Sequence, residues 1–245
     1  MIPKDFYFIW FCDQEYEVGL LHYLAMKSCL VNNAPCRVTL LCNNEPTGGR
    51  WTELSPHINV VVDSDIEGPD YRAVSNAKRF ELLKQGGVYC DLDVLIFAPI
   101  PDQLFESGCV ACEVGFTKKP LLNSCLIMAD AGSQFLQFWA KKTLDRIEVG
   151  SPSGATVLEH GVDYVGSEPG LVTVGREAFF MDKPNGASYR DFFLKEDFDL
   201  GNTWGIHLWG SFSRSRRFPS PAEVLTQYPE GFFAQYAKEI IEATI

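Results

Sequence analysis

Apolar residues along this chain follow two alternating patterns, short continuous runs and longer segments with an apolar residue at every third or fourth position. The short runs, at 6–11, 36–42 and 58–62, are typical of buried strands. The longer segments, at 15–33 and 71–85, have the spacing of amphipathic helices. This alternation predicts an α/β fold with a mainly parallel central sheet.

The rest of the chain continues with short apolar runs and further helical segments. Strands are predicted at 94–97, 109–114, 124–128 and 171–174, and helices at 132–147, from 151 and from 221. With 245 residues and 46% hydrophobic content, the chain can bury one sizeable core. We therefore expect a single domain over residues 1–245.

Two aspartates carry the strongest chemical signal. Asp91 and Asp93 are separated by one apolar residue and lie between a Gly86-Gly87 turn and the apolar run at 94–97. In an extended chain residues i and i+2 point to the same side, and two carboxylates there repel each other unless a cation lies between them. Mn²⁺ or Mg²⁺, which prefer oxygen ligands and substrate phosphates, fit this arrangement. The alternative is a pair of solvated loop residues.

A second Asp-x-Asp, formed by Asp63 and Asp65, competes for this role. It has neither a preceding glycine turn nor a following strand. We therefore interpret it as a solvated loop.

The segment around the first pair has a wider resemblance. Arg79, followed by Gly86-Gly87-Val88-Tyr89-Cys90-Asp91-Leu92-Asp93, resembles the DXD sugar-binding region of glycosyltransferase family thirty-two. The catalytic domains of the clostridial glucosylating toxins have a similar motif. The resemblance implies the GT-A nucleotide-diphospho-sugar transferase fold and retention of anomeric configuration. It also implies that Asp91 and Asp93 hold the metal on the diphosphate, that Arg79 assists there, and that Tyr89 packs under the ribose or a phosphate.

Three further positions extend the resemblance. The first aromatic run ends in Trp10, which in the similar enzymes stacks on the nucleotide base; the alternative is a core or edge tryptophan. Asn76 stands where the family has the aspartate of an Asp-x-x-Arg that binds sugar hydroxyls, so it departs from the pattern. Asn123 resembles an asparagine near the acceptor side of the sugar, and its alternative is a turn residue.

The C-terminal part adds His207 and Trp209, which resemble the His-x-Trp ending of the family. The resemblance implies that His207 completes the metal site or faces the diphosphate, with imidazole as a ligand that Mn²⁺ accepts. The alternative is a structural histidine between two tryptophans. A basic cluster at 213–217 is a candidate phosphate or acceptor contact, or else a solvated loop.

Charge and composition restrict the partners. The formal net charge of −11 disfavours nucleic-acid binding and stable docking on anionic membranes. The chain contains no run of about 18 apolar residues, so no membrane span is predicted. The start of the chain does not resemble a secretory signal.

The eight cysteines lie mostly in apolar runs, which is typical of reduced cytoplasmic proteins. Cys109 and Cys112 lack the second pair that a zinc ribbon needs, and a redox role has only weak support because they do not open a helix.

Together these observations predict a metal-dependent hexosyltransferase of polysaccharide biosynthesis. The donor is a nucleotide diphosphate sugar, with a UDP-sugar the first choice and GDP-mannose the second, and the acceptor is a glycan or glycolipid hydroxyl. The rival is a Mg²⁺-dependent phosphatase or nucleotide hydrolase, whose nucleophilic aspartate usually closes a strand, whereas this pair is expected to open one. A catalytically inactive sugar-binding module is a third reading, against which the presence of Asp91, Asp93, Arg79 and His207 argues.

Overall fold

The computed structural model describes residues 1–68, 70–113, 121–150, 171–175, 177–180, 187–209 and 220–245. Its strands are β1 (Asp5–Trp10), β2 (Arg37–Cys42), β3 (Asn59–Val62), β4 (Gly87–Cys90), β5 (Val94–Ile96), β6 (Cys109–Glu113), β7 (Leu122–Ala129), β8 (Leu171–Val174), β9 (Phe179–Phe180) and β10 (Gly205–His207). Its helices are α1 (Leu20–Asn32), α2 (Gly49–Leu54), α3 (Tyr71–Leu82), α4 (Asp102–Phe105), α5 (Gln134–Glu148), α7 (Ala187–Leu194), α9 (Pro221–Gln227) and α10 (Phe232–Glu242), with 3₁₀ turns at Ser55–His57 and Leu83–Gln85. The helix expected from 151 and the basic cluster at 213–217 lie outside the described residues.

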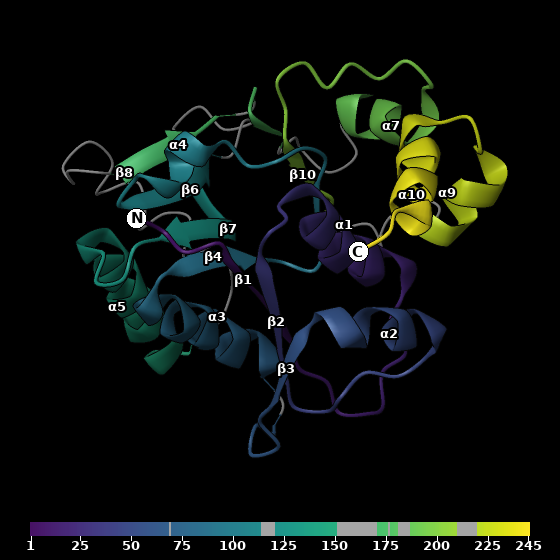
Figure 1. The fold of residues 1–245 in the computed structure, drawn as a ribbon. Coiled ribbons are helices and arrows are strands. Elements are labelled where there is room, and N and C mark those ends of the chain that lie inside the picture. The colour runs from purple at the N-terminus through teal and green to yellow at the C-terminus, as the bar shows by residue number, and fades with distance from the viewer. Residues whose placement is uncertain (69, 114–120, 151–170, 176, 181–186, 210–219) are drawn as a thin grey trace.

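Seven strands form the central sheet, in the order β3-β2-β1-β4-β7-β6-β8 (Figure 1). β7 runs antiparallel to its neighbours β4 and β6, whereas the other paired strands of this sheet are parallel. The predicted α/β fold with a mainly parallel sheet is therefore confirmed.

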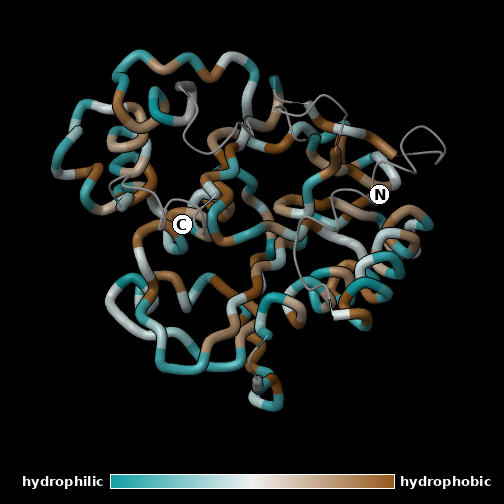
Figure 2. The backbone as a smooth tube through the Cα atoms, turned by 180° about the vertical axis from the view of Figure 1, so that it is seen from behind, coloured by the Kyte–Doolittle hydropathy of each residue, from teal (hydrophilic) through white to brown (hydrophobic). Residues whose placement is uncertain are grey.

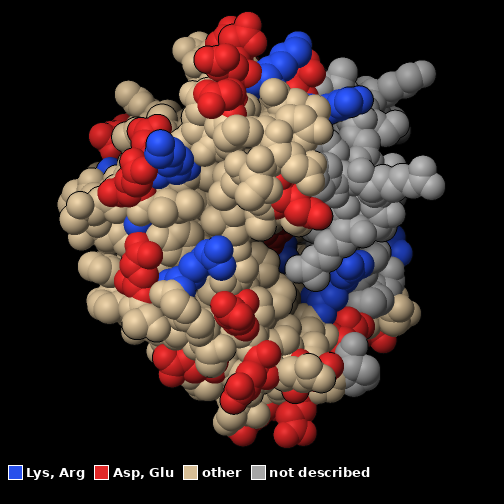
Figure 3. Space-filling view, turned by 90° about the vertical axis from the view of Figure 1, so that its right-hand side faces the viewer, with Lys and Arg blue, Asp and Glu red and all other residues tan. Residues whose placement is uncertain are grey.

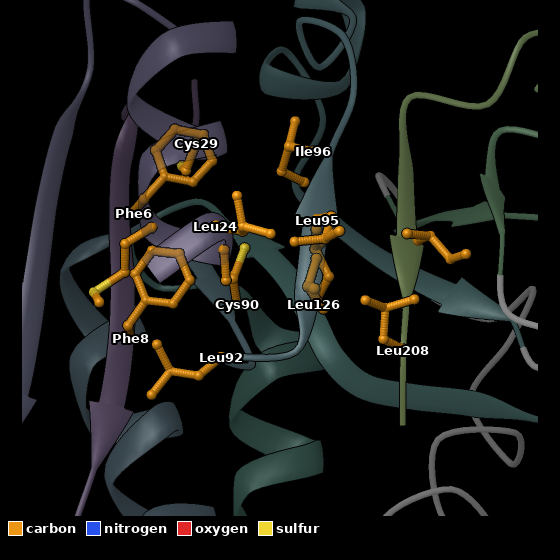
Figure 4. Packing of buried hydrophobic residues seen from close by; sticks show 14 of the residues in the cluster. Phe6, Phe8, Leu24, Cys29, Cys90, Leu92, Leu95, Ile96, Leu126 and Leu208 are labelled. Carbon is orange, nitrogen blue, oxygen red and sulfur yellow. The ribbon is translucent and has the colours of Figure 1, made fainter. Parts of the chain in front are cut away.

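The two faces of the central sheet pack against different helices. Phe6 and Phe8 of β1 belong to a cluster that includes residues of α1, α7 and α10, and Figure 4 shows both rings beside Leu24 of α1. Ile9 of the same strand packs on the other face, with residues of α3 and α5. This alternation is the period of two that a strand imposes on its side chains. Hydrophobic residues accordingly follow the inner strands in Figure 2.

A smaller sheet of three strands, in the order β5-β10-β9, lies on the side of the central sheet that α1 covers. β10 pairs antiparallel with β5 and parallel with β9. The apolar run at 94–97, predicted as a buried strand, forms β5. This strand belongs to the smaller sheet, while Gly87 already begins the central strand β4.

Gly86 and Gly87 are required by their backbone conformation. Their φ angles are 83° and 129°, values that residues with a Cβ rarely adopt. A Cβ on Gly87 would also lie 2.6 Å from the carbonyl oxygen of Asp5 in the neighbouring strand. The pair therefore ends the helical segment, as predicted, and lets β4 approach β1 closely.

The predicted helix at 15–33 begins later than expected, at Leu20. The backbone of the preceding residues is used elsewhere: the Val18 amide donates to the Thr47 carbonyl at 3.1 Å, and the Thr47 amide donates to the Tyr16 carbonyl at 2.8 Å. These groups cannot also make helical hydrogen bonds. Residues 11–19 therefore form a loop, which becomes important at the site described below.

The Cys109-Val-Ala-Cys112 segment lies in β6, and both cysteines are buried and neither forms a disulfide. Cys109 packs with the α3 and α5 side of the sheet and Cys112 with the opposite side. The two thiols therefore do not form a redox pair in this fold. Among the described residues, no helix is both long and apolar enough to cross a membrane.

The buried ammonium group of Lys27 links the helices α1, α2 and α10. Lys27 of α1 is 2% exposed. Its Nζ donates to the Tyr23 hydroxyl at 3.0 Å, to Oε1 of Glu53 in α2 at 2.6 Å and to the carbonyl of Ile241 in α10 at 2.9 Å. A buried ammonium is tolerated only when it is paired in this way.

We predict that Glu53→Ala lowers the free energy of unfolding by about 2 kcal/mol at pH 7, because the buried ammonium loses its carboxylate. The value lies below that of a fully buried pair since the Glu53 side chain is 48% exposed. Urea denaturation measures it, with the exposed Glu239→Ala, whose side chain makes no ion pair among the described residues, as the control.

The same pair has a predictable pH dependence. The hydrogen bonds from Lys27 and then Tyr23 lower the pKa of Glu53. Its contribution is therefore complete above the unfolded-state pKa of about 4.3 and is lost as the pH falls through the lower folded pKa. The stability difference between parent and Glu53→Ala should shrink in acid, and a difference that stays constant down to about pH 3 would contradict the assignment.

Candidate functional site

A cleft of about 1030 Å³ opens beside the carboxyl ends of β1 and β4. β1 pairs with β2 on one side and β4 on the other, while α1, which follows β1, and α3, which precedes β4, cover opposite faces of the sheet. This reversal is a topological switch point, where open α/β sheets bind their ligands. The sequence-predicted residues among its lining are Trp10, Asn76, Arg79, Tyr89, Asp91 and Asp93.

Asp91 and Asp93 lie in a turn and not in an extended chain. The Val94 amide donates to the Asp91 carbonyl at 3.1 Å, and the Asp91 amide donates to the Cys125 carbonyl of β7 at 2.7 Å. Asp91 directly follows β4 and Asp93 directly precedes β5. The expectation that the pair only opens a strand is therefore wrong, because Asp91 also closes one.

His207 joins the two aspartates through the smaller sheet. Antiparallel pairing sets His207 opposite Val94, and the Leu208 amide donates to the Asp93 carbonyl at 2.8 Å. The His207 Nε2 atom then lies 3.2 Å from Oδ1 of Asp93. One ligand atom from each of Asp91, Asp93 and His207 lies within 4.8 Å of the others. Two carboxylates and one imidazole in this arrangement fit a Mn²⁺ or Mg²⁺ ion, with imidazole favouring Mn²⁺.

Burial and neighbouring groups shift the pKa values of Asp91 and His207 in this cluster. Burial raises the pKa of Asp91, an effect that Arg79 opposes and Asp93 reinforces. Burial alone would lower the pKa of His207, but its neighbours Cys125 and Asp93 raise it well above its usual value. A metal ion bound here would therefore compete with a proton on His207, so the affinity of the site for the metal should fall in acid.

Arg79 is only 7% exposed and is held by several groups. Its Nη1 donates to the carbonyl and the hydroxyl of Ser124, at 3.0 and 2.5 Å, and its Nη2 lies 3.6 Å from Oδ1 of Asp91. Its guanidinium carbon lies 4.5 Å from the ring centre of Tyr89, whose hydroxyl donates to Oδ1 of Asp91 at 2.6 Å. Arg79 and Tyr89 thus orient Asp91. Within the described part of the chain, the buried Nε of Arg79 has no hydrogen-bond partner.

The remaining predicted residues divide into cleft and supporting positions. Asn76 is buried, one turn before Arg79 on α3, and lines the cleft. Asn123 does not belong to the described lining; its Oδ1 accepts a hydrogen bond from the Cys125 amide at 2.8 Å. Trp209, with a φ of 51°, places its ring centre 4.4 Å from that of His207. The fold therefore brings His207 to the aspartates, while Asn123 supports the strand that anchors Asp91.

Sequence reasoning missed three residues of this region. Tyr16 and His22 line the cleft and contact Trp10, with ring centres 4.5 Å from it in each case. Ser124 holds Arg79 although the two residues are 45 positions apart. No motif marks any of the three, because each contact depends on the folded chain. His22, which the pattern assigned simply to a helix, does lie in α1.

No family model matches this chain. Over 136 residues, half of the chain, it is 27% identical to Glucan organizing enzyme 1 of Cryptococcus neoformans var. grubii serotype A, and the match covers 37% of that protein. The chain therefore matches little more than a third of the length of this curated relative.

Solved structures of glycosyltransferases match the fold more completely. The galactosyltransferase LgtC, in complex with donor and acceptor sugar analogs, aligns with a TM-score of 0.53 at 10% identity over 98% of this chain and 97% of its own. The apo form of the glycosyltransferase GlyE in Streptococcus pneumoniae TIGR4 aligns with a TM-score of 0.57 at 13% identity, over 98% and 63%. This chain has the GT-A glycosyltransferase fold. PaToxG glycosyltransferase, with a TM-score of 0.51 at 11% identity over 67% of this chain and 70% of its own, agrees. The predicted resemblance to glycosyltransferases is thus confirmed at the level of the fold.

We predict that Arg79→Lys lowers the free energy of unfolding by about 2–4 kcal/mol, because one ammonium cannot replace a planar guanidinium that contacts Ser124 and Asp91 together. Thermal and urea denaturation measure the loss.

Arg72→Lys is the matched control. Arg72 lies on the same helix and lines the same cleft, but it is exposed. Its substitution should change stability by less than about 0.5 kcal/mol. Equal effects of the two substitutions would show that Arg79 does not hold the site together.

Proposed function

We propose that this protein is a metal-dependent glycosyltransferase that moves a hexose from a nucleotide diphosphate sugar to a hydroxyl of a glycan or glycolipid, with retention of configuration. One observation carries the proposal: Asp91 and Asp93 line the cleft at the switch point of a GT-A fold, with Arg79 and His207 beside them. The acidic chain supplies few cations for a diphosphate, so a metal ion at this cluster meets the need.

Each residue has a defined part in this proposal. Asp91, Asp93 and His207 would hold Mn²⁺ or Mg²⁺, which when bound neutralises charge on the leaving nucleoside diphosphate. Arg79 orients Asp91, and its guanidinium, which lines the cleft, adds positive charge beside the diphosphate. Trp10, at the carboxyl end of β1, stacks on the base, with UDP the first choice and GDP the second.

The contact with the donor sugar is proposed from the lining of the cleft. Asn76 is one helical turn from Arg79, so its amide is placed to bind hydroxyl groups of the donor sugar. Because this residue is an amide and not a carboxylate, it adds no negative charge beside the diphosphate. A role in polysaccharide biosynthesis accords with the name of the Cryptococcus relative, Glucan organizing enzyme 1.

A Mg²⁺-dependent phosphatase or nucleotide hydrolase is the second candidate. The observation in its favour is that Asp91 closes β4, as a nucleophilic aspartate of such enzymes usually does. Against it, Oδ1 of Asp91 is already engaged by other side chains. The Tyr89 hydroxyl donates to it, and Nη2 of Arg79 lies 3.6 Å from it. The GT-A fold also favours transfer.

Binding of a nucleoside diphosphate should require the metal. Calorimetric titration with UDP or GDP should show binding in Mn²⁺ and none in EDTA, and Asp93→Asn should weaken it about tenfold or more. The control is Asp65→Asn, which removes an exposed carboxylate of the other Asp-x-Asp and should bind like the parent. Equal affinity in Mn²⁺ and EDTA would exclude the proposed metal role.

A panel of nucleotide sugars separates the candidates. With Mn²⁺ and no acceptor, a transferase should slowly hydrolyse one donor at the sugar–phosphate bond, and Asp93→Asn should reduce this rate about a hundredfold. Release of inorganic phosphate from nucleotides or simple phosphomonoesters would instead support the hydrolase. Nucleotide-sugar binding without any turnover, even when candidate acceptors are added, would support a binding module.

A further inference from the structure

Three aromatic rings gather at one end of the cleft. Trp10 is the last residue of β1, Tyr16 lies in the loop 11–19 and His22 lies in the first turn of α1. The ring centres of Tyr16 and His22 are each 4.5 Å from that of Trp10, and Tyr16 is nearly parallel to it, at 28°. All three residues line the cleft.

The distances decide on which side of the indole these rings lie. If Tyr16 and His22 covered opposite faces of Trp10, their centres would be separated by nearly the sum of their distances to it. They are only 5.5 Å apart. The two rings therefore do not lie over opposite faces of Trp10. Tyr16, which is nearly parallel to the indole, stacks on one face, and His22, tilted by 55°, packs beside it towards the edge of the indole. The face opposite Tyr16 receives no stacking contact from either ring.

The two covering residues are themselves held in place. The side chain of Asn43, after β2, accepts from the Cys12 amide at 3.0 Å and donates to the Cys12 carbonyl at 2.9 Å. The Tyr71 hydroxyl of α3 donates to Oδ1 of Asp13 at 2.6 Å. These bonds fix the loop 11–19 at both the β2 and the α3 side. The Tyr16 hydroxyl is also hydrogen-bonded to Nδ1 of His22, which links the loop to α1.

Packing, and not hydrogen bonding, sets the orientation of Trp10. Its Nε1 atom is buried and has no hydrogen-bond partner among the residues that the structure describes. Trp10 packs against the hydrophobic core, and the rings of Tyr16 and His22 add aromatic contacts to the indole at this end of the cleft. A stacking surface that is fixed before the ligand arrives binds it with less loss of conformational entropy.

We propose that Tyr16 and His22 are positioning residues for nucleotide recognition: Tyr16 backs one face of Trp10, His22 holds Tyr16 and the edge of the indole, and the opposite face is left to the base of the donor. This inference rests on the proposed function, and it assigns the recognition of the base to a three-residue unit instead of to Trp10 alone. The unit acts on the base and not on the diphosphate, because the groups assigned to the diphosphate come from α3, the turn after β4, and β10.

The test compares two ligands on the Mn²⁺-loaded full chain. UDP and GDP contain the base and the diphosphate, whereas inorganic pyrophosphate contains only the latter. Tyr16→Ala should weaken nucleoside diphosphate binding about tenfold, as expected for partial loss of a stacking contact. Its affinity for pyrophosphate should stay within about twofold of the parent, because the metal cluster is untouched. Trp10→Ala should show the same pattern with a larger loss.

Milder variants and a control complete the design. Tyr16→Phe keeps the ring and loses only the hydrogen bond to His22, so it should lose less affinity than Tyr16→Ala. Tyr228→Ala removes a tyrosine that is 39% exposed at the end of α9 and should bind both ligands like the parent. Should Tyr16→Ala not fold, His22→Ala decides by the same two titrations, with an expected loss of about threefold for the nucleotide alone.

Three results would overturn the inference. Nucleoside diphosphate binding by Tyr16→Ala that equals or exceeds that of the parent would show that Tyr16 does not support the base site. Equal weakening of nucleotide and pyrophosphate would show a general structural role. Failure of the parent itself to bind either ligand with Mn²⁺ would overturn the proposed function and this inference together, which distinguishes it from the first two results.

Discussion

The turn from Asp91 to Val94 is the point at which the chain leaves the central sheet, and the candidate site depends on it. Before the turn, β4 is paired with β1 and β7; after it, β5 is paired with β10. Hydrogen bonds fix both sides, from the Asp91 amide to Cys125 and from the Leu208 amide to Asp93. Backbone geometry therefore holds two aspartates, one from each side of the turn, beside the histidine of β10, and Tyr89 and Arg79 orient the side chain of Asp91.

The smaller sheet is in turn fixed by α1 and α10. β5 is an edge strand, whose unpaired backbone groups would be costly if buried without partners. Side chains take the place of a neighbouring strand. The Ile96 amide donates to Oγ of Ser28 at 3.2 Å, and its carbonyl accepts from Asn32 Nδ2 at 2.6 Å and from the Tyr236 hydroxyl at 2.7 Å. Burial of Lys27 nearby on α1 adds a further link to α10, so the position of Asp93 is coupled to the packing of these helices.

Charge explains why this arrangement suits a cation. The chain is acidic overall, with a net charge of −11, and acidic side chains are spread widely over the face drawn in Figure 3. Within the cluster, burial raises the pKa of Asp91 and Asp93 reinforces the effect. Arg79 offsets part of this repulsion, but it is shared with Ser124. A divalent ion would complete the compensation and would also provide the positive charge that a diphosphate requires.

Local patterns in the sequence were sufficient to predict most strands and helices and the glycine pair before β4. These predictions succeed because periodicity and backbone conformation depend on residues that are near one another in the chain. The pairing of His207 with Asp91 and Asp93 was expected from a resemblance, and the fold is what brings the three side chains together. Only the tertiary structure decided that β5 leaves the central sheet, that Asp91 closes a strand, and that Ser124 holds Arg79. It alone also placed Tyr16 and His22 against Trp10. The reason is physical: sheet membership and side-chain packing depend on which distant segments compete for the same backbone groups and surfaces, and no local pattern records that competition.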